Sequence, residues 1–429
     1  MTLGEALGYA RAHQPSLQAA RARVAAAAAD TRISRAQWLP GFGLTLQAFE
    51  GTANNSTASY VGVRSVDIPR IGGTAVHATG TFRPSTSTLG AIGGTQEIFD
   101  FGRIAAEAAV SDVAHEAEQQ HADAVRLGVE LLVKDAFFAV QGAREVQRAA
   151  EDAFARSRLH RDMAAAEVKS GLHAPIELTR AEADLTKFDV ARIRAAGSLA
   201  TTQAVFAAAV GVDDPTLDAA GEPPPAAPLP PLDQSLRTSL ERDPLLLEAR
   251  TRVRGADAVT RALAAQVRPN LSLTATFSGR GSTAEPNGGP LSPDYGPAPA
   301  IANWDVGLVM SWPLYDPVIA ARREAAATRA DVARADVTTL AQQETSAVQQ
   351  AYVAVHIAQA ALVGLARAVD AARANYAQAE ARFKAGLGTS LELADAEAVR
   401  TDVEIQLAVG RYDALRARAV LARLMAEET

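Results

Sequence analysis

Residues 15–24 read PSLQAARARV and residues 244–253 read PLLLEARTRV, a match at a constant offset of 229. The same register extends over residues 12–48 and 241–277. Further along, the offset falls to 216 at Asp100 and Asp316 and to 215 at the turn residues 171–172 and 386–387. The chain is therefore a tandem duplication of one structural unit, and such a repeat constrains the fold more strongly than any single motif.

The duplication divides the chain into a first repeat, residues 1–210, and a second repeat, residues 233–429. Residues 211–232 join them, and the seven prolines from Pro215 to Pro231 exclude a helix or a central strand there. The length difference between the repeats falls in residues 50–90, a stretch rich in Gly, Ser, Thr and Asn. We expect a surface loop there and in its shorter counterpart, 279–302.

Each repeat is predicted to run in the order helix, strand, loop, strand, very long helix, short turn, helix. In the first repeat the predicted elements are a helix at 2–37, strands at about 40–50 and 88–99, a long helix at 101–167, a tip turn at 168–174 and a helix at 174–210. In the second they are strands at about 269–278 and 303–314, a long helix at 317–383, a tip turn at 384–389 and a helix at 390–426.

The strands of the second repeat alternate apolar and polar residues, which predicts one apolar and one polar face. Trp304 and Trp312 fall on the same face, about 26 Å apart at ~3.3 Å per residue. This matches the apolar band between aromatic girdles in outer-membrane barrels, although a half-buried hairpin of a soluble sheet alternates in the same way. Because four strands cannot close a barrel, a membrane location requires several chains to share one.

The long helices carry a heptad repeat. In residues 317–383 the series is Ala341, Val348, Val355, Leu362, Val369, Tyr376 and Phe383. Period seven predicts left-handed coiled-coil packing, and 67 residues of helix would span about 100 Å. A structural coiled-coil rod is therefore the alternative interpretation. Helices of about 36 residues at 2–37 and 174–210 would together match one long helix, which favours a layered wall.

Composition excludes several functions. The 429 residues carry a net charge of −7, which argues against a nucleic-acid partner, and contain no cysteine for disulfides or thiolate chemistry. No motif of a hydrolase, a zinc protease, a P-loop or a dinucleotide-binding fold is present, so no catalytic residue, metal site or cofactor is predicted. No uninterrupted apolar run of about 18 residues and no signal peptide is visible, so a membrane role depends on strands.

Four local motifs follow one another along the two repeats. They are RAQWLP at 35–40, IFDFGR at 98–103, WPLYD at 312–316, and the Gly-Leu turns at 171–172 and 386–387. In their order and duplication they resemble the motifs of the TolC family of outer-membrane efflux channels. The resemblance covers essentially the whole chain. One departure is Pro317, where the family usually continues with Gly, so the strand-to-helix turn of the second repeat is left open.

The resemblance implies a mixed α and β fold in which each chain gives four strands to a 12-stranded trimeric β-barrel. Its long coiled-coil helices would form a periplasmic α-helical tunnel. It also implies a homotrimer in the outer membrane of a Gram-negative cell, extending into the periplasm. Its partners would be outer-membrane lipid, a periplasmic adaptor protein and an inner-membrane transporter, in an efflux pump or a type I secretion system. The sequence does not separate drugs, metal ions and polypeptides as cargo.

The resemblance assigns adaptor docking to the helix-to-helix turns, that is, to Gly171, Leu172, Gly386 and Leu387. Simple helix capping explains the same residues, because Gly ends a helix in the left-handed conformation and the following Leu packs back on the last turn. Both roles remain open from the sequence.

The resemblance further implies an acidic gate at the tunnel entrance, formed by Glu392 and Asp395 with Glu177 as the first-repeat counterpart. Threefold symmetry would turn each into a carboxylate ring that favours cations. Capping is again the alternative, since Thr389 and Glu392 have the spacing of a capping box and Pro175 suits the first helical position. No basic or aromatic gate partner is evident, because Gly388 stands where one is expected. Trp304 and Trp312 are assigned to the membrane aromatic girdle.

Overall fold

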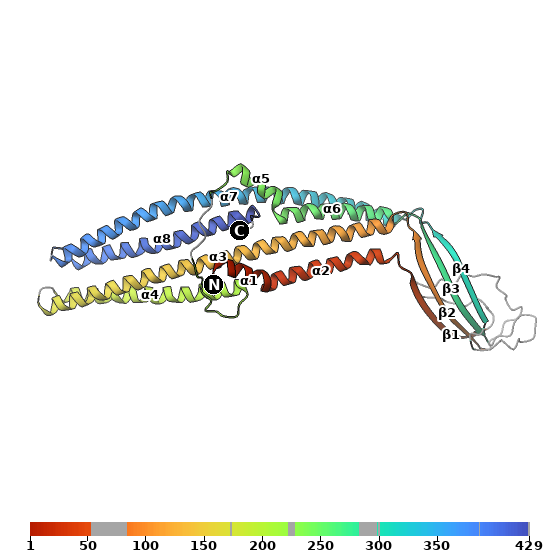
Figure 1. The fold of residues 1–429 in the computed structure, drawn as a ribbon, viewed down its shortest axis with the longest axis horizontal. Coiled ribbons are helices and arrows are strands. Elements are labelled where there is room, and N and C mark those ends of the chain that lie inside the picture. The colour runs from red at the N-terminus through yellow and green to blue at the C-terminus, as the bar shows by residue number, and fades with distance from the viewer. Residues whose placement is uncertain are drawn as a thin grey trace, which may run out of the picture. The chain divides into compact units, whose positions relative to one another are not determined.

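The structure, a computed structural model, describes residues 1–52, 84–171, 174–221, 228–282, 298, 301–385 and 387–427 (Figure 1). Most of the two segments predicted to be surface loops lies outside this range. The elements of the first repeat are α1 (Leu3–His13), α2 (Pro15–Ala36), β1 (Gly41–Thr52), β2 (Pro84–Phe99), α3 (Arg103–Lys169) and α4 (Pro175–Val210). Those of the second are α5 (Leu232–Arg242), α6 (Pro244–Ala265), β3 (Asn270–Ser282), β4 (Ile301–Ser311), α7 (Pro317–Lys384) and α8 (Ser390–Leu424).

The chain forms two compact units that do not coincide with the two repeats. One unit contains residues 1–25, 116–250 and 334–429, and the other contains residues 26–115 and 251–333. Each unit therefore draws on both copies of the repeat, and α2, α3, α6 and α7 contribute residues to both. The sequence therefore divides into two repeats along the chain, whereas each compact unit contains corresponding segments of both repeats.

The unit of residues 26–115 and 251–333 holds the sheet, in which the strand order is β1-β2-β3-β4 and every pair is antiparallel. The central β2–β3 pairing joins the two repeats, and the strands lie side by side in Figure 1. Among the described residues, β1 and β4 have no strand on their outer sides. The sheet of one chain therefore has two open edges.

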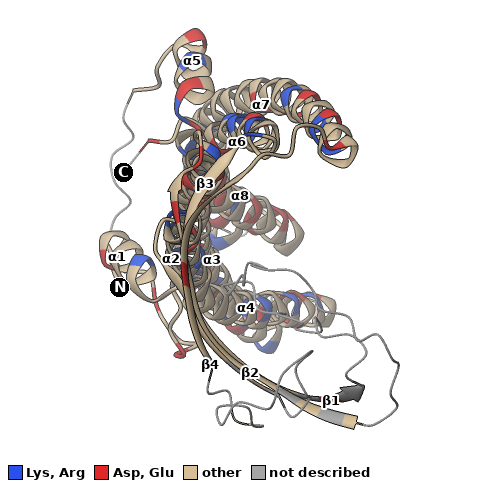
Figure 2. Cartoon of the chain, turned by 90° about the vertical axis from the view of Figure 1, so that its right-hand side faces the viewer, with Lys and Arg blue, Asp and Glu red and all other residues tan. Residues whose placement is uncertain are grey.

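The sheet exposes its apolar face. The register places Leu44, Ile92, Phe277 and Trp304 in one row across all four strands. Their exposed fractions are 62%, 55%, 56% and 77%. The opposite face carries small polar side chains such as Thr45, Thr276 and Ser278, all of them buried. Figure 2 shows charged residues gathered on the helices, while the strands are mostly free of them. This is the reverse of a soluble sheet, which buries its apolar side.

The helix predicted at 2–37 is in fact two helices, α1 and α2. Pro15 begins α2, and a proline disfavours the helical conformation in the residue before it. Gln14 accordingly adopts an extended conformation, with ψ 122°. The second repeat breaks in the same way, since Asp243 has ψ 120° before Pro244. The sequence prediction was wrong here because it gave the proline too little weight inside a helical pattern.

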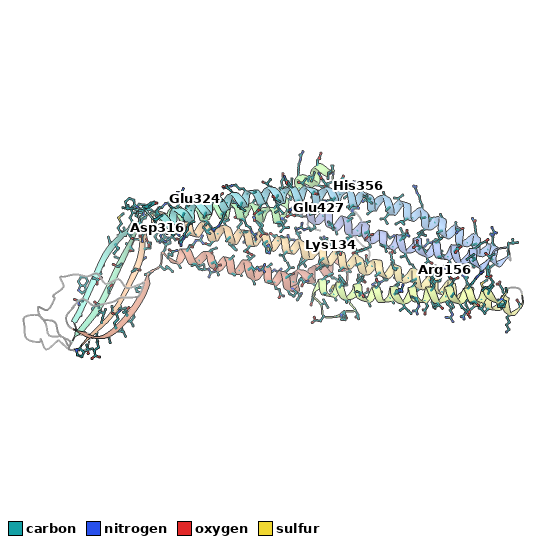
Figure 3. The ribbon with its side chains drawn as sticks, turned by 180° about the vertical axis from the view of Figure 1, so that it is seen from behind. Lys134, Arg156, Asp316, Glu324, His356 and Glu427 are labelled. Atoms are coloured by element: carbon teal, nitrogen blue, oxygen red, sulfur yellow. The ribbon has the colours of Figure 1, made fainter. Side chains whose placement is uncertain are left out.

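An aspartate starts each long helix. The Asp100 carboxylate accepts hydrogen bonds from the backbone N–H groups of Gly102, at 2.9 Å, and of Ile104. Asp316, labelled in Figure 3, accepts from Val318 at 2.8 Å and from Ile319 at 3.2 Å. These side chains satisfy backbone donors that a helix end leaves free.

The two turns before the long helices differ at the position that the sequence left open. In the first repeat, Phe101 and Gly102 adopt left-handed conformations with φ 52° and 86°. In the second, Pro317 is the first residue of α7, where its fixed φ and missing N–H are well tolerated. The departure from the family pattern therefore changes the turn and leaves the aspartate cap intact.

The heptad residues of α7 face the interior of the unit of residues 1–25, 116–250 and 334–429. Val348, Val355, Val369, Tyr376 and Phe383 are all buried. Val348 and Val355 pack in a cluster with Leu421 and Leu424 of α8. In the first repeat, Val133 and Val140 of α3 belong to the equivalent cluster. The heptad prediction is confirmed as the packing face of the long helices.

A buried polar group ties the short helices to the long ones in the second repeat. The Ser239 hydroxyl of α5 donates to Glu344 of α7 at 2.7 Å. Asp243, which is 1% exposed, accepts from the Leu245 N–H at 2.7 Å and pairs with Arg423 of α8 at 3.2 Å. Burial raises the pKa of the Glu344 carboxyl, and the Ser239 hydrogen bond opposes this only partly.

The raised pKa makes Glu344 a source of pH-dependent stability. Below its unfolded pKa the carboxyl is neutral in both states, and stability falls as pH rises through the higher folded pKa. We expect Glu344→Gln, which keeps an acceptor for Ser239, to unfold at a higher denaturant concentration than the parent at pH 7 and equally at pH 4. A Gln variant that is less stable than the parent at pH 7 would contradict this.

Candidate functional site

Gly171 ends the α3 side of the first helix-to-helix turn, between α3 and α4. It has φ 77°, and its N–H bonds to the Val168 carbonyl at 3.1 Å. The prediction of a left-handed glycine at this turn is confirmed, because only glycine adopts that conformation without steric cost. Leu172 and Gly386, which were also predicted to dock the adaptor, lie outside the described residues.

The second turn, between α7 and α8, presents Leu387 to solvent. Its side chain is 75% exposed, so the expectation that this leucine packs back on the helix is wrong for the second turn. The N–H groups of Leu387 and Gly388 both bond to the Arg382 carbonyl, at 2.9 and 3.1 Å. A Cβ on Gly388 would lie 3.2 Å from the Phe383 nitrogen, so a glycine lets the turn fold closely onto α7.

The acidic residues after the turns fall into two environments. Thr389 caps α8, because its hydroxyl accepts a hydrogen bond from the Glu392 N–H at 3.3 Å, and the exposed Glu392 carboxylate lies 3.8 Å from Arg382 of α7. Arg382 is the basic partner that the sequence reasoning missed, because it precedes the turn. Asp395 is exposed. The two carboxylates thus stand on the open surface near the start of α8.

Glu177 is placed differently, although it occupies the same position in α4 that Glu392 occupies in α8. Pro175 is the first residue of α4, as predicted. The Glu177 carboxylate pairs with Arg180 at 3.2 Å and accepts a hydrogen bond from Ser390 of α8. It therefore links the first helical turns of α4 and α8, and among the described residues it does not group with Glu392 and Asp395 as three ligands of one metal ion would.

A buried ion pair joins α3 to α8. Arg156, labelled in Figure 3, donates through Nε to both carboxylate oxygens of Glu397, at 2.8 and 3.0 Å. The Thr401 hydroxyl adds a bond to Glu397 at 3.1 Å. Burial raises the pKa of Glu397 despite the attraction of Arg156. The partners are 241 positions apart, so no local pattern in the sequence indicates the pair.

A second polar contact, between α3 and α7, lies beside the ion pair. His160 Nε2 is 3.0 Å from the Tyr376 hydroxyl, and Arg400 of α8 lies over the Tyr376 ring at 4.9 Å from its centre. Burial lowers the pKa of His160, so its ring is neutral at pH 7. Burial and the nearby carboxylates of Glu397 and Glu380 raise the pKa of Tyr376 to about 12. These contacts couple the α3–α4 hairpin to the α7–α8 hairpin.

The two tryptophans assigned to a girdle are both strongly exposed. Trp304 lies within β4, opposite Phe277 of β3. Trp312 is 56% exposed and follows the last residue of β4, Ser311, so the strand is shorter than predicted. Two exposed tryptophans, one within β4 and one directly after it, fit a membrane interface.

A family model described as outer membrane efflux protein matches residues 6–212 and 236–427. The chain belongs to the outer membrane efflux protein family. The two matched segments correspond closely to the two repeats, and together they cover nearly the whole chain. No curated protein sequence matches at a significant level.

Solved structures of outer-membrane channels share the fold of this efflux protein. The channel OprN has 21% identity and a TM-score of 0.79, over 99% of this chain and 90% of its own. CmeC of Campylobacter jejuni has 15% identity and a TM-score of 0.78, over 99% and 85%. VceC of Vibrio cholerae has 19% identity and a TM-score of 0.76, over 99% and 96%.

Family membership resolves the choice between a channel and a coiled-coil rod. The protein is an outer-membrane efflux channel that extends into the periplasm, and its fold is the TolC-like one expected from the sequence. The family is one of channel proteins. The fold combines the four-stranded sheet with a helical part that carries the turns and the ion pair described above.

The Arg156–Glu397 pair gives a stability prediction. Glu397→Ala would take the closer of two carboxylates from a largely buried guanidinium and leave only Glu404, at 3.9 Å, so we expect a loss of about 2–3 kcal/mol in the free energy of unfolding. The control is Glu145→Ala, which removes an exposed pair with Arg411 between the same two helices, α3 and α8. The control should cost about 0.5 kcal/mol or less. Denaturant unfolding followed by helical circular dichroism measures both, and equal losses would contradict the assignment.

Proposed function

We propose that three copies of this chain form one channel, in which their sheets close a 12-stranded barrel and their helices form a tunnel. The exposed apolar row of Leu44, Ile92, Phe277 and Trp304 is the observation that carries the proposal. Water would oppose so much contiguous apolar surface, whereas the hydrocarbon of a membrane favours it. The small polar side chains on the opposite face suit a watery interior.

The open edges of the sheet support the same proposal. Lipid offers no hydrogen-bond partner for the free backbone groups of β1 and β4. Pairing β4 of one copy with β1 of the next satisfies both edges, and three copies supply twelve strands. Closed symmetry of this kind removes every edge.

Helix α7 supplies further support, because apolar residues outside its heptad stripe remain uncovered. Val353, Ile357 and Val363 are all more than half exposed. Within the described residues, α7 alone is long and apolar enough to cross a membrane, and only 11% of its most apolar stretch is buried. We assign this surface to contact with a neighbouring copy, since the heptad face of the same helix already packs on α8.

We further propose that the channel is a passive duct of a tripartite assembly, with a periplasmic adaptor and an inner-membrane transporter as partners. The adaptor would dock on the helix-to-helix turns at Gly171, Leu172, Gly386 and Leu387. The exposure of Leu387 and the left-handed turn at Gly171 support this proposal. Transport through such a duct involves no covalent chemistry. Drugs, metal ions and polypeptides remain alternatives for the cargo.

We also propose that Glu392 and Asp395 form the acidic entrance of the tunnel. Both carboxylates are exposed near the start of α8, and threefold symmetry would repeat them as rings. Glu177 plays a different part in this proposal, because its carboxylate already bonds to Arg180 and Ser390. It would hold α4 against α8 beside the entrance.

The membrane-facing side of the sheet can be tested by charge substitution. We expect Val306→Arg, on the apolar face of β4, to cost about 2–4 kcal/mol and to reduce barrel assembly in the outer membrane. Asp305→Arg, one residue away on the polar face, should assemble normally. The measurement is the amount of heat-modifiable protein in isolated outer membranes. Equal assembly of the two variants would contradict the proposed orientation.

The acidic entrance can be tested in planar bilayers. The variant Glu392→Gln with Asp395→Asn should lose preference for cations and resist block by multivalent cations, because its entrance carries no carboxylate rings. The control changes two exposed acids of α5, Asp233→Asn with Glu241→Gln, and should behave as the parent. Unchanged conductance and unchanged cation block in the first variant would reject the entrance assignment.

A further inference from the structure

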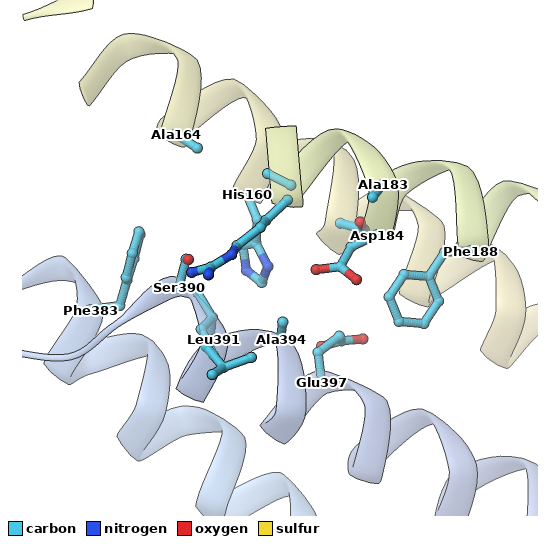
Figure 4. Close-up of a pocket in the computed structure, with 14 residues that line it drawn as sticks. His160, Ala164, Ala183, Asp184, Phe188, Phe383, Ser390, Leu391, Ala394 and Glu397 are labelled. Carbon is cyan, nitrogen blue, oxygen red and sulfur yellow. The ribbon is translucent and has the colours of Figure 1, made fainter. Parts of the chain in front are cut away.

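A cavity of about 260 Å³ lies where helices α3, α4, α7 and α8 face one another (Figure 4). Its walls are largely apolar, with alanines of three helices and the side chains of Phe188, Phe383, Leu391 and Leu393. Helix interfaces normally close-pack, and an unfilled space of this size forfeits contacts. The volume lies just below the range of about 300–1,000 Å³ for ligand pockets, so only a small ligand would fit.

The cavity contains a carboxylate that the protein itself does not neutralise. Figure 4 shows Asp184 of α4 directed into the space between α4 and α8. Among the described residues, no hydrogen bond or ion pair of its side chain is found. Arg180, also in the wall, pairs with Glu177, and Glu397 pairs with Arg156. His160 in the opposite wall is neutral at pH 7, because burial lowers its pKa. The cavity therefore carries a net negative charge.

The remaining walls suit an organic cation better than a metal ion. Phe188 and Phe383 present aromatic rings, which attract ammonium groups and accept apolar groups. Within the described part of the chain, no three His, Asp or Glu side chains are grouped as a metal ion requires. A ligand with one ammonium group and one small apolar body would match both the charge and the lining.

We propose that this cavity binds a small organic cation, with the ammonium group on the Asp184 carboxylate and the apolar body between Phe188 and Phe383. The occupant would contact both hairpins, α3–α4 and α7–α8, and so would stabilise their present spacing. That second consequence rests on the proposed function, since it concerns opening of the channel. Binding itself depends only on the cavity.

The test is calorimetric titration of the detergent-solubilised protein with phenethylammonium. The background carries Glu392→Gln and Asp395→Asn, so that the exposed acids at the start of α8 do not bind the probe. We expect saturable binding that Asp184→Asn weakens roughly tenfold or more, because a charge-assisted contact is lost. The matched control Glu182→Gln removes an exposed acid two positions away on α4 and should bind as the background does.

Two further measurements distinguish the contribution of the ligand's charge from that of the cavity volume. The neutral analogue 2-phenylethanol should bind roughly tenfold or more weakly than phenethylammonium. Ala394→Leu, which fills the cavity and leaves its charges unchanged, should abolish binding, with circular dichroism confirming that the variant folds. No saturable binding, equal effects of Asp184→Asn and Glu182→Gln, or full binding by Ala394→Leu would overturn the proposal. Binding without any effect on conductance would overturn only the stabilised spacing, and a parent protein that forms no channel would instead contradict the proposed function.

Discussion

Backbone hydrogen bonding at the edges of the four-stranded sheet is the constraint on which the rest of the molecule depends. β1 and β4 end the sheet with unpaired donors and acceptors among the described residues, while its apolar side chains point outward. Membrane hydrocarbon suits the side chains and cannot satisfy the backbone, so both requirements are met only in a closed barrel. A chain with four strands must share that barrel, and the proposed trimer follows from this need.

The helical part shows how a duplicated chain becomes one structure. The heptad faces of α3 and α7 are buried in equivalent clusters, so each repeat packs its own hairpin by the same rule. Specific polar contacts then join the repeats, above all the Arg156–Glu397 pair between α3 and α8. Removing one partner of a buried ion pair costs far more stability than removing one partner of an exposed pair. The Arg156–Glu397 pair therefore holds the two hairpins together.

The sequence predicted the features that follow local geometric rules. These are the alternation in the strands, the heptads of α7 and the left-handed glycine at residue 171. Contacts between distant helices follow no such rule, so the Arg156–Glu397 pair and the cavity beside Asp184 required the structure. The break before Pro15 could have been predicted, since proline disfavours helix in the preceding residue. Arg382 was missed as the partner of Glu392 because the turn brings it back beside α8.

The mass of the purified protein tests most directly whether three chains complete one membrane barrel. Native mass spectrometry of the protein extracted from outer membranes should give three copies in one complex. That complex should require detergent to stay soluble, because the apolar face of every sheet points outward. A monomer that is stable in buffer without detergent would contradict the account.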